Sequence, residues 1–261
     1  MRRVEAGAGE PAVVLEAGMN NGAKSWARVT PLLAPHLRVA AYDRAGIGGS
    51  APAPGLVTID RQLGDLASVI IGLAAGPCVL AGHSWGGVLV QLLAFRRPDL
   101  AAGLVLVDPG HEEMERLLPP PVRWGWRVTR GVFPDELRAD APVTMAALRE
   151  LRAAPTSFPD VPVVVLSAAR GFPRRFRAGW TRLQAELAAA APRGRHVVVA
   201  GTGHNIPRDR PDAVADTILA VAAQARLTFT RPGDTSSPGH APWLDFPAWR
   251  YRVYFRPKYG R

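Results

Sequence analysis

Short apolar segments rich in β-branched residues alternate along this chain with longer segments in which apolar residues recur every three or four positions. The first pattern predicts strands at 12–16, 37–42, 78–81, 103–107, 161–166 and 196–199. The second pattern predicts helices at 25–33, 59–75, 86–96, 180–190 and 211–225. Strands that alternate with helices of this length predict an α/β fold. Its sheet is mostly parallel with helices on both faces, because parallel neighbours need crossover connections.

Two segments interrupt this alternation. Residues 110–158 have no strand pattern and predict a small helical cap, inserted into a core made of residues 1–109 and 159–226. Residues 227–261 form a basic C-terminal tail that holds eight of the chain's 19 aromatic residues. Aromatic residues and arginines alternate over 249–256 with the period of a strand, so the tail could add to a sheet edge or bind a partner or membrane surface. We expect it to be loosely ordered.

The composition is that of a soluble globular protein, with 48% apolar and 21% charged residues among 261. It excludes collagen-like, coiled-coil and mostly disordered chains. The single cysteine, Cys78, can form neither an intramolecular disulfide nor a cysteine-based zinc site, which favours a reducing, cytoplasmic location. We expect no signal peptide, because residues 1–9 lack an apolar stretch. We also expect no membrane span, because a Gly-Pro pair interrupts the uncharged run 66–82.

The net charge of +10 invites a nucleic-acid partner. However, 30 of the 32 basic residues are arginine, and the two lysines are Lys24 and Lys258. Phosphate contacts would use both residue types, so the ratio indicates a GC-rich coding bias, and we expect no nucleic-acid binding. The tail contributes +4 of the charge, so the basicity is partly a property of this segment.

A candidate nucleophile lies between the predicted strand 78–81 and the predicted helix 86–96. The string G-H-S-W-G at 82–86 has the pattern G-x-S-x-G. At a sharp strand-to-helix turn, this pattern holds a serine, here Ser84, in a strained backbone with its hydroxyl above the sheet. The helix would direct its positive N-terminal end and the Trp85 N–H at a developing oxyanion. The alternative is a tight glycine-rich turn with an incidental serine.

Four other short segments accompany this turn in a fixed order. They are LEAG at 15–18 with Trp26 eight residues after its glycine, DRAGIGGS at 43–50, LVLVD at 104–108 and GTGH at 201–204. Together the five segments resemble the α/β-hydrolase fold superfamily, specifically its capped, single-domain members, over residues 4–226. The string at 43–50 is similar to the family's D-R-x-G-x-G-x-S loop, and its spacing does not match a dinucleotide fingerprint.

The resemblance implies that His204, which follows the last predicted strand, is the catalytic base. A serine hydroxyl needs such an imidazole to accept its proton during attack. In many relatives the catalytic acid follows the strand after the cap, but residues 167–171 contain no carboxylate. Asp108 occupies the known alternative position and would hold the His204 tautomer. The remaining alternatives are that Asp108 only caps a helix, or that Glu112 or Glu113 is the acid.

The resemblance also implies two backbone donors for an oxyanion, the N–H groups of Met19 and Trp85. The substrate pocket is expected to be apolar with a few polar anchors. The residues expected to line it are Asn20, Trp124, Trp126 and Phe133. Ser84 excludes the dehalogenase-like and epoxide-hydrolase-like branches, which need an aspartate nucleophile.

These features predict a serine hydrolase that cleaves a carboxylic ester or thioester of a small, largely apolar substrate through an acyl-enzyme. No cofactor or metal is implied, since the histidines are scattered and no metal-ligand spacing is present. A serine aminopeptidase or amidase, and a non-catalytic ligand-binding protein of the same fold, remain alternatives. The arginines within 170–182 predict a solvated face, or alternatively a site for an anionic substrate such as a carrier-bound thioester.

The first predicted strand begins near residue 12, whereas relatives usually have two earlier strands. We therefore expect a sheet of about six strands, or else a coding sequence that starts further upstream. Upstream sequence with two more strand patterns would decide between these possibilities.

Overall fold

A computed structural model describes residues 1–55, 57–74, 76–121, 141–153, 158–171, 173–228 and 252–253. Its strands are β1 (Arg3–Ala6), β2 (Val13–Glu16), β3 (Val39–Tyr42), β4 (Cys78–His83), β5 (Ala101–Val107), β6 (Pro162–Ala168), β7 (Arg193–Val199) and β8 (Arg252–Val253). Its α-helices are α1 (Thr30–Leu33), α2 (Ile59–Leu73), α3 (Trp85–Arg96), α6 (Ala141–Ala153), α7 (Arg174–Ala190), α8 (Ile206–Asp209) and α9 (Pro211–Thr228). Short 3-10 helices are η1 (Ala23–Trp26), η2 (Pro98–Leu100) and η3 (Met114–Leu117).

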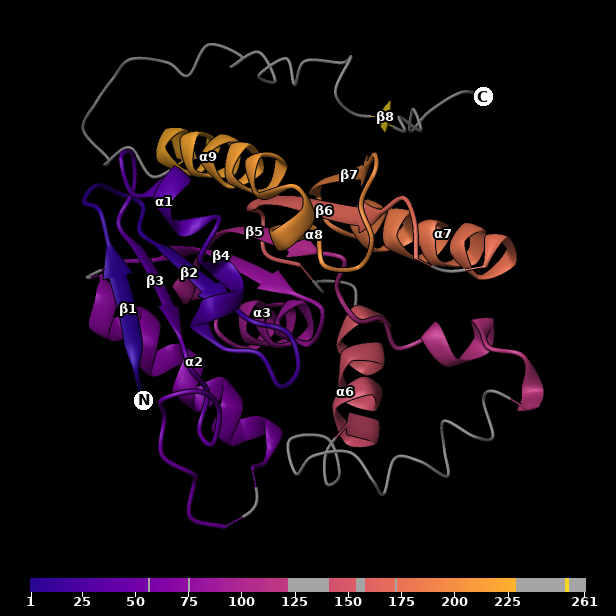
Figure 1. Cartoon of the computed structure of the whole chain (residues 1–261), viewed down its shortest axis with the longest axis horizontal. Coiled ribbons are helices and arrows are strands. Elements are labelled where there is room, and N and C mark those ends of the chain that lie inside the picture. Colours follow the sequence, from indigo (N-terminus) through magenta and orange to yellow (C-terminus); the bar gives the residue numbers. More distant parts are fainter. Residues whose placement is uncertain are drawn as a thin grey trace.

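The strands form one sheet in the order β1-β3-β2-β4-β5-β6-β7-β8. Strands β2 to β7 are parallel, and β1 and β8 pair antiparallel at the two edges. Helices α2, α3 and α7 cover one face and α1 and α9 the other (Figure 1). Every residue of β2 to β6 is buried, as in parallel sheets that are covered on both faces. The predicted α/β fold class is therefore confirmed.

The strand order reverses beside β2, which lies between β3 and β4. The carboxyl ends of the central strands lie level with one another, because Glu16 pairs with Gly82 and His83 pairs with Val107. The loops that follow β2, β4 and β5 therefore meet at one edge of the sheet. In open α/β sheets, ligands bind at the carboxyl edge where the strand order reverses.

The expectation of about six strands is wrong, because the sheet has eight. Strand β1 escaped detection because its sequence RVEA is polar and largely exposed, which leaves no apolar pattern. It lies at the edge of the sheet and is held by antiparallel pairing with β3. Strand β8 comes from the tail and pairs with β7, with Val253 opposite Val197. Residues 229–251 and 254–261 lie outside the described residues, so the loosely ordered tail stays a prediction.

The described part of the inserted segment contains the helices η3 and α6 and no strand. Residues 122–140 and 154–157 lie outside the described residues, so the boundaries of the predicted cap stay a prediction. Helix α7 begins six residues before the predicted start and contains the arginine-rich segment in its first turns. No helix in the described ranges has both the length and the apolar character needed to cross a membrane.

Candidate active site

Ser84 occupies the sharp turn between β4 and α3. Its backbone has φ 53° and ψ −115°, a region that non-glycine residues rarely adopt and that costs of order 1–3 kcal/mol. Hydrogen bonds hold this turn: the Ser84 N–H donates to Val107 O at 3.1 Å, and Ser84 O accepts from the N–H groups of Gly87 and Gly110 at 3.0 Å. The neighbouring strand β5 and the segment that follows it therefore stabilise the strained conformation.

The two glycines of the motif are required by close backbone contacts. A Cβ on Gly82 would lie 2.4 Å from the carbonyl oxygen of Gly86. A Cβ on Gly86 would lie 2.3 Å from the carbonyl oxygen of Glu16 on β2. Both distances are far below van der Waals contact, so glycine is required at position 82 for the turn to close and at position 86 for the turn to pack against β2. The G-x-S-x-G spacing therefore has a steric reason in the structure.

The structure brings Ser84, Asp108 and His204 into one hydrogen-bonded chain. His204 Nε2 lies 3.0 Å from Ser84 Oγ, and His204 Nδ1 lies 2.6 Å from Asp108 Oδ2. A carboxylate only accepts hydrogen bonds, so Nδ1 carries the proton and Nε2 is the acceptor for the serine hydroxyl. The Asp108 side chain is fully buried, whereas the His204 side chain is 46% exposed. The imidazole can therefore reach solvent and a bound molecule, while its carboxylate partner cannot.

Asp108 is held by three donors around its carboxylate. Oδ1 accepts from the Trp180 indole Nε1 at 2.8 Å and from the Ala168 N–H at 3.2 Å, and Oδ2 faces His204. Its backbone has φ 42°, and its N–H donates to Leu166 O at 2.7 Å. Sequence reasoning missed Trp180, because a tryptophan on the buried side of a helix has no local feature that distinguishes a hydrogen-bond donor from a core residue.

The alternative acids, Glu112 and Glu113, pair with arginines of α6 rather than with His204. Glu112 pairs with the largely buried Arg152 of α6 at 2.7 Å. Glu113 pairs with Arg149 of the same helix at 2.9 Å. Both carboxylates thus anchor α6 to the segment that follows β5, and the carboxylate at His204 is that of Asp108.

His83 supports the loop that carries His204. Its Nε2 lies 2.8 Å from the main-chain oxygen of His204 and so donates to it, and the two rings have centroids 4.9 Å apart. Burial, and to a smaller extent the neighbouring His204 ring, lower the pKa of His83 to about 4. His83 is therefore a neutral donor at neutral pH.

The predicted oxyanion donors lie on either side of Ser84. Gly18 approaches so closely that a Cβ there would lie 3.4 Å from Ser84 Cβ, which places the following Met19 beside the nucleophile. Trp85 is the first residue of α3, and its indole Nε1 donates to Gln62 Oε1 on α2, away from the turn. Within the described part of the chain, neither the Met19 N–H nor the Trp85 N–H donates a hydrogen bond.

A buried ion pair stabilises the loop that contains Met19. Arg44 pairs with Glu16 at 2.5 Å and also donates to the carbonyl oxygens of Ala17 and Gly18 at 2.7 Å. Tyr42 donates from its hydroxyl to the same glutamate, and burial, followed by the Glu16 charge, raises the pKa of Tyr42 well above its usual value. Sequence reasoning missed this cluster, although two of its residues lie within the quoted motifs.

The expected pocket residues are partly accounted for. Asn20 lies in the same loop as Met19, with φ 53°, and is exposed. Trp124, Trp126 and Phe133 lie outside the described residues. Among the arginines of 170–182, Arg182 is 70% exposed and pairs with Glu186, as expected of a solvated helix face. The part of the chain that the structure describes holds no cluster of three or more histidine, cysteine, aspartate or glutamate side chains suited to a metal ion.

Comparisons with known proteins identify the family of this chain and proteins of the same fold. The sequence model of the Alpha/beta hydrolase family matches residues 13–217. The chain is 26% identical over 220 residues to the uncharacterized protein YqjL of Bacillus subtilis, covering 82% of this chain and 85% of that protein. It is 39% identical over 92 residues to lipase LipV of Mycobacterium tuberculosis, covering 35% of this chain and 34% of the lipase. A thermophilic esterase from Thermogutta terrifontis has the same fold, with a TM-score of 0.64 at 23% identity over 86% of this chain and 93% of the esterase.

Proposed function

Because the chain belongs to the alpha/beta hydrolase family, we propose that it is a serine hydrolase that cleaves carboxylic esters or thioesters of small molecules through an acyl-enzyme. The observation that carries this proposal is the continuous relay from Ser84 Oγ through His204 to the buried Asp108. The similarity to lipase LipV over 92 residues supports an ester bond as the target.

The relay supplies the proton transfers of acyl transfer. Ser84 Oγ attacks the carbonyl carbon while its proton passes to His204 Nε2, and Asp108 stabilises the resulting imidazolium. The carbon–oxygen or carbon–sulfur bond then breaks as His204 returns the proton to the leaving alcohol or thiol. A water molecule repeats the sequence on the acyl-enzyme and releases the acid and the free serine. These steps use only groups of this chain and water.

The N–H groups of Met19 and Trp85 complete the mechanism. Donors directed at the negative oxygen of the tetrahedral intermediate stabilise it more than the substrate, and losing one such donor costs about two to three orders of magnitude in rate in serine hydrolases. The ion pair of Arg44 and Glu16 fixes the loop that contains Met19, so the Met19 N–H does not need to change position during the reaction. The oxyanion hole is therefore formed before the substrate binds.

A fluorophosphonate probe tests the proposal, since it reacts with an activated serine hydroxyl. We expect wild-type protein to be labelled and Ser84→Ala to lose the label. Ser68→Ala is the matched control, because Ser68 is an exposed serine on α2 whose hydroxyl bonds to Gly64 O. Folded wild-type protein that takes no label would contradict the proposal.

A panel of short aryl esters, thioesters and anilides then separates the reaction classes. Turnover of esters or thioesters supports the proposal, whereas turnover of anilides alone would indicate an amidase. Binding of these molecules without turnover would indicate a non-catalytic ligand-binding protein.

A further inference from the structure

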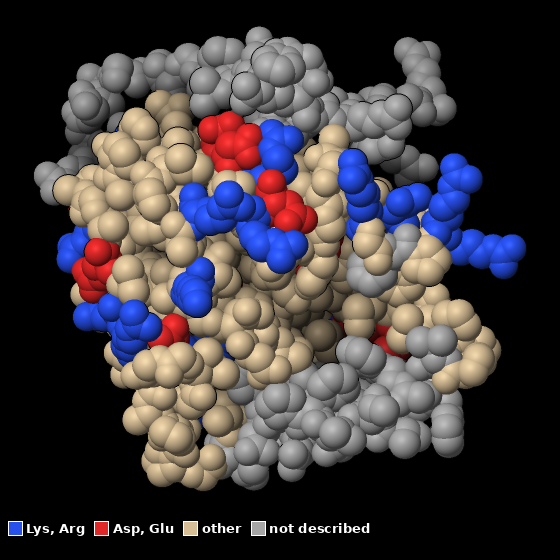
Figure 2. Space-filling model, in the orientation of Figure 1, with Lys and Arg blue, Asp and Glu red and all other residues tan. Residues whose placement is uncertain are grey.

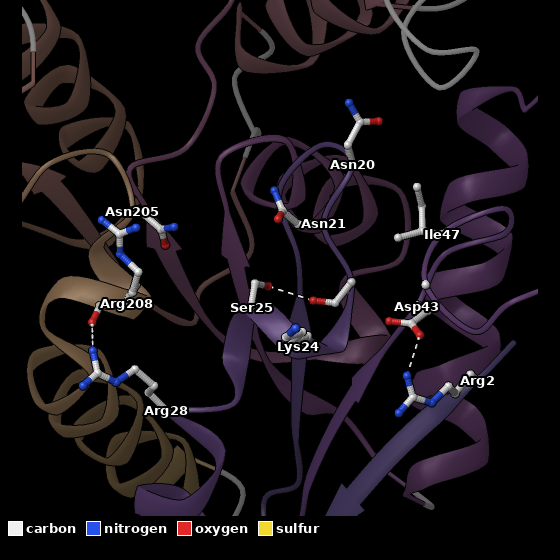
Figure 3. A pocket seen from close by; sticks show the side chains of 12 residues that line it. Arg2, Asn20, Asn21, Lys24, Ser25, Arg28, Asp43, Ile47, Asn205 and Arg208 are labelled. Carbon is white, nitrogen blue, oxygen red and sulfur yellow. Dashed lines mark hydrogen bonds and ion pairs between the residues drawn. The ribbon is translucent and has the colours of Figure 1, made fainter.

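A cavity of about 440 Å³ lies beside the candidate active site. It is bounded by η1, by the loop that follows β3 and by α8. Figure 3 shows Asn205 and Arg208 on one side, Asp43 and Arg2 on the other, and Lys24 and Ser25 between them. Most of the residues that line it therefore carry polar or charged side chains.

The charged groups of the cavity are predominantly basic. Four basic residues and one acidic residue line it: Arg2, Lys24, Arg28, Arg208 and Asp43. Basic side chains also gather on the exposed face shown in Figure 2. In the described residues, Lys24 and Arg28 form no ion pair with a carboxylate. Lys24 is notable because the chain has only two lysines among its 32 basic residues.

The one carboxylate of the cavity is already occupied. Asp43 Oδ1 accepts from the Ala23 N–H at 2.8 Å, and Oδ2 accepts from the Gly49 N–H at 2.9 Å and from Arg2 at 3.3 Å. Burial raises the pKa of Asp43, but these hydrogen bonds and the Arg2 charge outweigh it, so the pKa lies below its usual value. Asp43 is thus ionised, and its side chain is only 3% exposed. Its hydrogen bonds connect η1 to the loop that follows β3.

Asp43 also explains the glycines around it. A Cβ on Gly22 would lie 2.1 Å from Asp43 Oδ1, and a Cβ on Gly48 would lie 2.5 Å from Oδ2. The loop therefore closes tightly around this carboxylate. Arg2 pairs with this acid and Arg208 pairs with the adjacent Asp209, so among the described residues the unpaired positive charges of the cavity are those of Lys24 and Arg28.

The cavity adjoins the two segments that contain the proposed oxyanion donor Met19 and the proposed base His204. Asn20, on its lining, directly follows Met19, and Asn205 directly follows His204. Consecutive Cα atoms are about 3.8 Å apart, so the rim lies one residue from the proposed oxyanion donor and one residue from the proposed base.

We propose that this cavity binds an anionic group, a carboxylate or a phosphate, carried by the substrate that reacts at Ser84. Lys24 and Arg28 supply the charge, and the amides of Asn20 and Asn205 supply hydrogen-bond donors of the kind that oxyanions accept. This inference rests on the proposed hydrolase function and narrows its substrate class to esters or thioesters with an acidic end.

Matched ester pairs test the inference and locate the anion. On the acyl side, 4-nitrophenyl hydrogen glutarate is compared with 4-nitrophenyl pentanoate. On the leaving-group side, 4-carboxyphenyl pentanoate is compared with 4-carbamoylphenyl pentanoate. We expect kcat/KM to favour the anionic ester by about tenfold in one pair at low ionic strength. We expect that ratio to fall toward one in the double variant Lys24→Gln/Arg28→Gln and at about 0.5 M salt.

The matched control is Arg61→Gln, which removes a positive charge from the exposed surface of α2 and should keep the wild-type ratio. Ratios near one in both pairs for wild-type protein would overturn the inference while leaving the hydrolase function intact.

If no ester is turned over and no probe is bound, the proposed function fails. The anion site is then tested separately from turnover by calorimetry. The binding of glutarate and of inorganic phosphate is measured for wild-type protein and for the double variant. Binding that the double variant loses supports the site, and no binding overturns it.

Discussion

The indole Nε1 of Trp180 donates a 2.8 Å hydrogen bond to Oδ1 of Asp108, across 72 positions of sequence. Both side chains are buried, and the other carboxylate oxygen faces His204. The donor lies on α7, and its hydrogen bond to one carboxylate oxygen of Asp108 orients the other oxygen toward His204. Helix α7 therefore supports the candidate active site through its hydrogen bond to Asp108.

Replacing the indole tests this positioning role. Trp180→Phe keeps a buried aromatic ring but removes the donor to a charged acceptor, an interaction of about 1.5–3 kcal/mol. We expect kcat for an ester substrate to fall by about tenfold to a hundredfold while KM stays within about twofold. Phe176→Leu is the control, since Phe176 stacks on Trp180 without bonding to Asp108, and it should keep kcat. Equal losses in both variants would assign Trp180 a purely packing role.

Asp108→Asn should abolish most of the activity without unfolding the protein. Trp180 and the Ala168 N–H would retain the amide oxygen at the Oδ1 position, which leaves the amide NH₂ facing His204 Nδ1. Nδ1 must then accept, so Nε2 carries the proton and cannot take another from Ser84. We expect kcat to fall by about 10⁴-fold, the loss seen for the same change in serine proteases. Glu113→Gln should retain activity, and near wild-type turnover by Asp108→Asn would contradict the assignment.

Three buried histidines make stability depend on pH. Burial lowers the pKa of His83 and His196 to about 4 and that of His111 to about 3, from an unfolded value near 6.5. Between these values the unfolded chain binds protons that the native protein does not. The free energy of unfolding therefore decreases as pH falls from 6.5 toward 4, with a slope of about 1.4 kcal/mol per pH unit for each histidine.

Urea unfolding between pH 7 and pH 5 measures this slope before most carboxylates titrate. His196→Gln removes one of the three groups, and we expect its slope to be smaller by about one proton. His36→Gln serves as the control, because His36 is an exposed histidine near the end of α1, and it should keep the wild-type slope. A midpoint that does not change with pH over this range would refute the prediction.

The same substitution at two glycines should have opposite effects. Gly86→Ala places a Cβ 2.3 Å from Glu16 O, so we expect a loss of about 3 kcal/mol or more and no probe labelling. Gly64 lies within α2 with no heavy atom near the Cβ position. Gly64→Ala should stabilise the protein by about 0.5–1 kcal/mol through helix propensity. Denaturant midpoints compare the two, and a stable, labelled Gly86→Ala protein would contradict the steric account of the turn.

Local pattern was enough to predict the order of the central strands and helices and the turn that holds Ser84, whereas His204 was predicted from the resemblance of five ordered segments to a known family. Buried parallel strands and amphipathic helices repeat their apolar residues with periods that a short window contains, and the G-x-S-x-G turn is five residues long. The edge strand β1 was not predictable in this way, because its RVEA sequence has no buried face and its existence depends on pairing with β3.

Only the tertiary structure shows which carboxylate contacts His204 and what surrounds it. The family resemblance favoured Asp108 but left Glu112 and Glu113 open, because the three lie within six positions of one another. In the structure, Arg149 and Arg152 on α6 pair with the two glutamates and direct them away from His204. Residues from distant segments also meet in three other features: the hydrogen bond from Trp180 to Asp108, the ion pair of Arg44 with Glu16, and the cavity lined by Lys24 and Arg208. Such contacts depend on how the strands are ordered in the sheet, which the periodicity of any one segment does not encode.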